Sequence, residues 1–170
     1  MPGRRQTLAT ALLGLLATTC VIDPTEVRAE SASWLFASLL REKKILTYMR
    51  MPVSGKLVRL DEIKTAAEPA QMNVSPDRRT LFVSFRSTGQ LASFRIHPAN
   101  GSLTPVSVVA GGEDPAFMQP DSTGRLLISA YYASNKVTVH AVDEEGRISE
   151  QPLQTLRTAE KAHGVAIDSK

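Results

Sequence analysis

Short apolar runs, bounded by turn-forming residues, dominate the pattern of hydrophobic and polar positions after about residue 30. The runs alternate with stretches rich in β-branched or aromatic residues, and several are followed by turns that end in glycine. Runs of this length and composition are typical of β-strands, and the glycines suit turns that need a positive φ. The clearest runs lie at residues 81–85, 90–96, 126–132 and 136–142. The pattern predicts an all-β protein.

These runs recur at a nearly constant spacing of 45 or 46 residues. The matching columns are Leu35, Leu81 and Leu127; Ser38, Ser84 and Ala130; Ile45, Leu91 and Val137; Tyr48, Phe94 and His140; Gly55, Gly101 and Gly146; and Leu57, Leu103 and Ile148. Four short strands in a repeat of this length make the blade of a β-propeller. A β-sandwich is the alternative all-β architecture, but it needs no fixed repeat. The sequence therefore favours a propeller.

The repeat divides residues 30–170 into about three blades, at residues 33–63, 70–109 and 115–156, and residues 163–168 resemble the inner strand of a fourth. The outer strand of the third blade is expected near residues 148–156. The first repeat begins with its second strand, so a closed ring would supply its inner strand from the far C-terminus. Because propellers close with about four to eight blades, we expect an incomplete propeller. Its open sheet edges predict poor solubility when the chain is expressed alone.

Residues 1–29 have the pattern of a cleaved export signal. Arg4 and Arg5 precede an uncharged apolar stretch over residues 8–22, and residues 27–29 offer a cleavage site before Glu30. The apolar stretch is about 15 residues long, which is short for a membrane span of about 20. We expect cleavage after Ala29, a periplasmic or secreted protein and no membrane attachment afterwards. The general and twin-arginine export routes both stay open.

Charge and composition narrow the possible partners. The net charge is +3, and Lys and Arg are scattered among acidic residues, so no nucleic-acid footprint is expected. The single cysteine, Cys20, lies in the predicted signal, and the three histidines have no metal-ligand spacing. Neither a phosphate-binding glycine loop before a helix nor a Gly-x-Ser-x-Gly motif occurs. We expect no metal and no cofactor.

Four segments together resemble the lactonase seven-bladed β-propeller family. They are residues 74–83, 130–139, 143–148 and 162–167, and the resemblance covers about residues 33–170. The best-known type in the family is the bacterial 6-phosphogluconolactonase, which is related to the carboxymuconate-lactonizing cycloisomerases. The resemblance implies seven blades around a tunnel, a monomer when all blades are present, a small-molecule lactone substrate, and His, Arg and Glu side chains at one mouth. It makes His163 the candidate catalytic histidine and Tyr132 a candidate substrate-binding residue, with the Arg and Glu expected from later blades.

Opening a sugar δ-lactone requires a base that activates water and a group that stabilises the oxyanion. His163 could act as the base, or it could be a structural histidine that bonds loop backbone between blades. His140 shares its column with Tyr48 and Phe94, which indicates packing, and His97 lies in a predicted turn exposed to solvent. Three functions remain open at this point: a lactone hydrolase, a cycloisomerase-like relative, and a non-catalytic propeller used for binding or as a scaffold.

Overall fold

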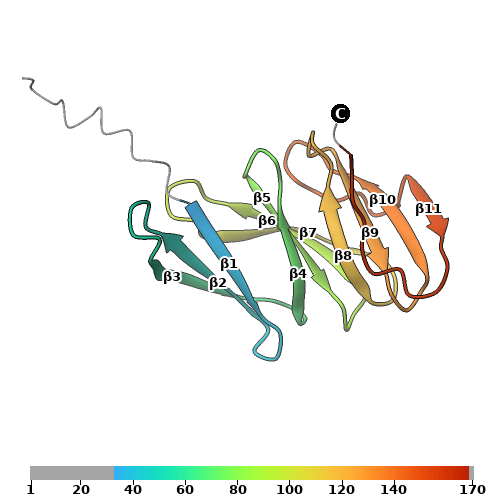
Figure 1. Ribbon diagram of the computed structural model, residues 1–170, viewed down its shortest axis with the longest axis horizontal. Helices are drawn as coiled ribbons and strands as arrows, with labels where there is room; N and C mark the ends of the chain where they lie inside the picture. The colour runs from blue at the N-terminus through green and yellow to red at the C-terminus, as the bar shows by residue number, and fades with distance from the viewer. Residues whose placement is uncertain (1–32, 169–170) are drawn as a thin grey trace, which may run out of the picture. The chain divides into compact units, whose positions relative to one another are not determined.

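The computed structural model describes residues 33–168, which form three antiparallel sheets (Figure 1). The first sheet contains β1 (Ser33–Leu39), β2 (Lys44–Arg50) and β3 (Leu57–Lys64). The second contains β4 (Pro69–Val74), β5 (Thr80–Phe85), β6 (Gln90–Ile96) and β7 (Leu103–Ala110). The third contains β8 (Pro115–Pro120), β9 (Leu126–Tyr131), β10 (Lys136–Ala141) and β11 (Gln154–Arg157). The predicted export signal, residues 1–29, lies outside the described residues.

The sheets have the topology of successive propeller blades. In the second and third sheets each strand pairs with the next one along the chain, and the first sheet starts with the strand that corresponds to β5 and β9. The inner strand β4 contacts both β1 and β8, so neighbouring sheets meet along their inner sides. The predicted all-β, incomplete propeller of about three blades is thus confirmed. In residues 33–168 no helix is long and apolar enough to cross a membrane.

Two details differ from the sequence prediction. The outer strand expected near residues 148–156 is shorter and later, because β11 covers only Gln154–Arg157, and Ile148 forms an isolated bridge with Val142. Pro152 has no backbone N–H, so it cannot donate to the ladder at that point. Residues 163–168, expected as the inner strand of a further blade, form no strand in the structure. A strand is recognised by its hydrogen bonds to a neighbouring strand, and within residues 33–168 no strand pairs with residues 163–168.

The hydrophobic core lies between the sheets. One cluster joins the first and second sheets and includes Ile45, Leu81 and Phe94; another joins the second and third and includes Phe82, Leu91 and Leu127. The repeat columns of the sequence are therefore the positions at which one blade packs on the next. His140 belongs to this layer: it is fully buried, and its Nδ1 lies 2.9 Å from the carbonyl oxygen of Ser149. Its interpretation as a packing residue is confirmed.

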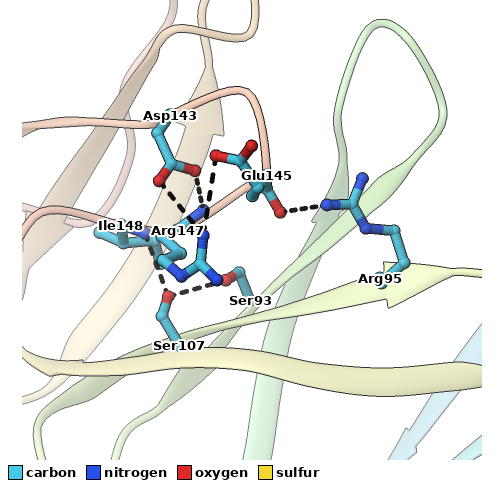
Figure 2. Close-up of polar contacts among 7 residues, drawn as sticks. All are labelled: Ser93, Arg95, Ser107, Asp143, Glu145, Arg147 and Ile148. Carbon is cyan, nitrogen blue, oxygen red and sulfur yellow. Dashed lines mark hydrogen bonds and ion pairs between the residues drawn. The ribbon is translucent and has the colours of Figure 1, made fainter.

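Polar contacts also join the second blade to the third (Figure 2). The backbone N–H of Ile148 donates to Ser107 Oγ at 3.0 Å, and Ser107 Oγ lies 2.8 Å from Ser93 Oγ. Arg95 Nη2 donates to the carbonyl oxygen of Glu145 at 2.5 Å. Within the turn itself, Arg147 contacts two acidic side chains, those of Asp143 and Glu145, at 3.6 Å each. The turn between β10 and Ile148 is thereby fixed against the second blade.

Candidate active site

One rim of the blades collects the residues that end each second strand and precede each inner strand. Pro115, the first residue of β8, pairs with Tyr131, the last residue of β9. In the second blade the first residue of β4, Pro69, likewise pairs with the last residue of β5, Phe85. Residues immediately outside these pairs must therefore lie at the same rim. In the second and third blades they are Arg86, which follows β5, Asp114, which precedes β8, and Tyr132, which follows β9.

An ion pair joins the second blade to the third at this rim. Arg86 donates to Asp114 through two nitrogens: Nη2 lies 2.9 Å from Oδ2, and Nε bonds to Oδ1. Such bidentate contacts fix the plane of the guanidinium group as well as its position. Among the described residues these bonds engage Nε and Nη2 and none engages Nη1. The pair therefore orients Arg86 and leaves one guanidinium nitrogen for another ligand.

Tyr132 and His163 meet at the same rim. Their ring centroids are 5.9 Å apart and the rings stand at 87°, an edge-to-face arrangement that aromatic rings favour. The backbone N–H of Tyr132 donates to the carbonyl oxygen of Asp114 at 2.9 Å, which links this ring pair to the ion pair. His163 is exposed and Tyr132 is half-buried, so both can meet a solute. Arg86, Asp114, Tyr132 and His163 form one continuous group, called here the rim cluster.

Electrostatics tie the members of the rim cluster together. Hydrogen bonds from Arg86 hold the pKa of the Asp114 carboxyl below its ordinary value, against an opposing effect of partial burial, and a positive charge on His163, when it carries one, lowers it further. The same hydrogen bonds raise the pKa of Arg86. Asp114 is therefore a carboxylate and Arg86 a cation at any pH near neutrality. The rim cluster therefore holds a fixed ion pair whose carboxylate lies within electrostatic reach of the imidazole of His163.

Two hollows flank the rim cluster. One of about 480 Å³ is lined by Arg86, Asp114 and their neighbours in the chain, which are residues 87–89, 110, 112 and 113. A smaller one of about 220 Å³ is lined by Tyr132, Ala133, Asn135, Glu160 and Lys161. A third hollow, of about 310 Å³, lies between turns at the opposite rim, away from His163. Only the first two adjoin the groups that could act on a substrate.

The structure thus brings together the two site residues predicted from the sequence, His163 and Tyr132. It adds Arg86 and Asp114, which the sequence analysis did not single out. A signal for Arg86 was present, because it lies 46 residues before Tyr132 and so occupies the same repeat column. Asp114 had no comparable signal, since its role depends on how the second blade packs on the third.

The opposite rim carries other charged or titratable side chains: Arg78 and Arg79 lie in the turn before β5, and His97 follows the end of β6. His97 is exposed and its Nε2 lies 2.9 Å from Thr104 Oγ1. Within residues 33–168 no group of three His, Cys, Asp or Glu side chains could hold a metal ion.

Curated relatives point to one kind of enzyme. The 6-phosphogluconolactonase of Xenorhabdus nematophila is 30% identical over 116 residues, covering 68% of this chain and 35% of that protein. The 6-phosphogluconolactonase of Pectobacterium atrosepticum is 29% identical over 127 residues, covering 75% of this chain and 38% of that protein. The chain thus spans just over a third of the length of the curated relatives it matches.

Solved structures agree on the fold. The periplasmic gluconolactonase of Pseudomonas aeruginosa matches with a TM-score of 0.69 at 22% identity, over 76% of this chain and 38% of that one. At this identity the likeness shows the architecture alone. The model of the family described as "Lactonase, 7-bladed beta-propeller" matches residues 35–167, nearly all of the described chain. The chain belongs to the lactonase seven-bladed β-propeller family.

Proposed function

We propose that the protein to which these blades belong hydrolyses a sugar δ-lactone to the open-chain acid. The observation that carries the proposal is the rim cluster, in which Arg86, Asp114, Tyr132 and His163 lie together at one mouth of the blades. Family membership and the naming of its relatives as 6-phosphogluconolactonases support the same reaction. This chain supplies about three of the blades, and later blades are expected to complete the site.

In the proposed reaction His163 acts as general base. Its neutral imidazole takes a proton from water as the water oxygen bonds to the lactone carbonyl carbon. The carbonyl electrons move onto oxygen, and a nearby guanidinium stabilises that oxyanion. When the oxyanion collapses, the bond between the carbonyl carbon and the ring oxygen breaks, and the imidazolium returns the proton to the leaving alkoxide. One water is consumed and one hydroxy acid is formed.

The other members of the rim cluster have positioning roles in this proposal. Tyr132 presents its ring to His163 and limits the orientations of the imidazole, and it borders a hollow into which a sugar ring could extend. Asp114 fixes the guanidinium of Arg86 through two hydrogen bonds, leaving Nη1 to bind a substrate oxygen. A guanidinium of fixed orientation can bind a carboxylate, a phosphate or an oxyanion.

We also propose that the protein is exported, on the basis of the signal-like pattern in residues 1–29. An exported enzyme would meet little phosphorylated cytosolic sugar, so an unphosphorylated lactone is the favoured substrate. A solved structure of the same fold comes from a protein described as a periplasmic gluconolactonase, which acts in the compartment proposed here.

The experiment is an acid-release assay of the complete gene product on δ-gluconolactone and on its 6-phosphate, with spontaneous hydrolysis subtracted. Hydrolysis of the unphosphorylated lactone at the greater kcat/KM is expected. A greater kcat/KM for the 6-phosphate would contradict the proposed unphosphorylated substrate but would still support a lactone hydrolase. Ring formation from an unsaturated acid, without hydrolysis of either lactone, would favour the cycloisomerase. Binding without turnover would favour a scaffold.

A further inference from the structure

One position in the turn between the second and third strands of each blade has a left-handed backbone. Lys43, Gly89 and Asn135 occupy it at a constant spacing of 46 residues, with φ angles of 52°, 69° and 50°. In each blade the carbonyl oxygen of this residue accepts a backbone N–H from the connection that follows the outer strand. The donors are Thr65 at 2.8 Å, Gly111 at 2.9 Å and Thr158 at 3.0 Å. Because this contact recurs in all three blades, it belongs to the fold rather than to a site.

The third blade adds a side-chain contact at the same position. Asn135 Oδ1 accepts the backbone N–H of Lys161 at 2.8 Å. Gly89 has no side chain and the ammonium group of Lys43 has no acceptor, so neither residue could make this contact. Asparagine suits the position because it tolerates a left-handed backbone and carries an acceptor on a short side chain. Asn135 therefore holds the connection at two points, through its carbonyl oxygen and through its side chain.

The connection held in this way leads to His163. Lys161 lies two residues before His163 and has a φ of 63°, a conformation that is uncommon for residues other than glycine. Such a conformation persists only where the surrounding structure holds it, and the hydrogen bond to Asn135 Oδ1 supplies that restraint. The direction in which the chain enters His163 is therefore fixed at Asn135.

The turn that contains Asn135 also begins with Tyr132, whose ring contacts the imidazole of His163. Tyr132, Asn135 and Lys161 line the same hollow of about 220 Å³ beside the rim cluster. His163 itself is exposed, so burial does little to fix its orientation. One turn thus provides two restraints on the imidazole, the ring of Tyr132 and the hydrogen bond of Asn135 to the backbone that precedes His163.

We infer that Asn135 is a positioning residue for His163 and that it acts through its side-chain oxygen. This role rests on the proposed function, in which His163 is the general base. Asn135 takes no proton and forms no bond in the reaction, but it sets where the imidazole stands relative to the lactone carbonyl. A displacement of about 1 Å can cost about 10²-fold in rate, so loss of this one hydrogen bond should be visible in kcat.

The test uses the complete gene product and three variants. Asn135→Gly keeps the left-handed backbone and the carbonyl that Thr158 contacts, as Gly89 does in the second blade, but it removes Oδ1. Asn135→Asp keeps an acceptor oxygen. The matched control is Lys43→Gly, the same change at the same repeat position in the first blade, where the connection carries no residue of the rim cluster. The two readouts are steady-state kinetics on δ-gluconolactone and the proton NMR signals of the His163 ring, which the adjacent ring of Tyr132 shifts.

For Asn135→Gly we expect kcat to fall about tenfold to a hundredfold with KM nearly unchanged, and the His163 signals to move toward those of a free histidine. Asn135→Asp should restore most of both, and Lys43→Gly should behave like the original protein. Unmoved His163 signals in Asn135→Gly would overturn the inference, and so would an unchanged kcat or a failure of Asn135→Asp to restore the signals. If the original protein hydrolyses no lactone, the proposed function fails, whereas the His163 signals are read without substrate and still decide whether Asn135 positions the ring.

Discussion

The imidazole of His163 stands edge-to-face to the ring of Tyr132, with centroids 5.9 Å apart. The two residues come from different parts of the repeat: Tyr132 follows the second strand of the third blade, and His163 lies in the segment after that blade. Arg86 occupies the repeat column of Tyr132, 46 residues earlier, and forms an ion pair with Asp114, which lies just before the inner strand β8. Asp114 and His163 are 49 residues apart, so the two contacts share one repeat column and differ in the other.

Replacing Tyr132 tests whether its ring positions His163. Aromatic pairs of this geometry contribute about 0.5–1.5 kcal/mol, so Tyr132→Ala should lower kcat of the complete protein by up to about tenfold. Tyr132→Phe retains the ring and should restore most of the rate. Steady-state kinetics on δ-gluconolactone provide the measurement. Equal losses in both variants would mean that the hydroxyl, rather than the ring, is what matters.

Replacing Arg86 tests the proposed anion contact. Arg86→Lys retains the charge but cannot form the bidentate contact with Asp114, and we expect KM to rise about tenfold or more with a smaller change in kcat. The matched control is Arg78→Ala, which removes an arginine from a turn at the opposite rim and should leave both constants unchanged. If Arg86→Lys behaves like that control, Arg86 takes no part in substrate binding.

The ion pair predicts a particular dependence of stability on pH. Because the pKa of Asp114 is lowered in the folded state, the stabilisation is complete above the ordinary carboxyl pKa of about 4 and is lost as the pH falls through the lowered value. Both side chains are partly exposed, so its size should stay below about 1 kcal/mol. Urea unfolding of the original chain and of Asp114→Asn measures the difference in free energy of unfolding. That difference should be constant from pH 7 to 5 and shrink below pH 4; shrinkage already above pH 5 would contradict the assignment.

The turn glycines predict unequal costs for the same substitution. Gly55 and Gly146 both have a positive φ, at 67° and 82°, so alanine at either position costs about 1–2 kcal/mol in backbone strain. Only at Gly146 does the new methyl also meet Thr80. We expect Gly146→Ala to destabilise the chain by at least about 1 kcal/mol more than Gly55→Ala, since overpacking typically costs 1–3 kcal/mol. Urea midpoints measure this, and equal midpoints would show that the turn does not press on the second blade.

Most of the fold was predictable because propeller blades repeat their packing. Leu81 and Leu127 share a repeat column and are both buried. The first repeat lacks an inner strand in the sequence, and the first sheet accordingly begins with the second strand of a blade, β1. The outer strand of the third blade was predicted near residues 148–156, whereas β11 covers Gln154–Arg157. The repeat pattern alone did not show where Pro152 would interrupt the hydrogen bonds to β10. Strand existence follows from the repeat, whereas strand ends depend on individual hydrogen bonds.

The site was predictable only in part. His163 and Tyr132 followed from the family resemblance, and the structure brings their rings together. The ion pair between Arg86 and Asp114 joins residues 28 positions apart in different blades, so it depends on how the blades stack, which no local pattern encodes. Comparing Arg86 with Tyr132 across the repeat would have identified one partner, but not the other.

His163 is the proposed general base of the lactone hydrolase, and the reaction depends on it more than on any other described residue. The most direct measurement compares acid release from δ-gluconolactone by the complete protein with His163→Ala and, as a matched control, with His97→Ala at an exposed histidine of the opposite rim. We expect kcat to fall by about 10²–10⁴-fold for His163→Ala, the usual contribution of a general base, and to be unchanged for His97→Ala. Unchanged turnover in His163→Ala, with the sheets retained, would contradict it.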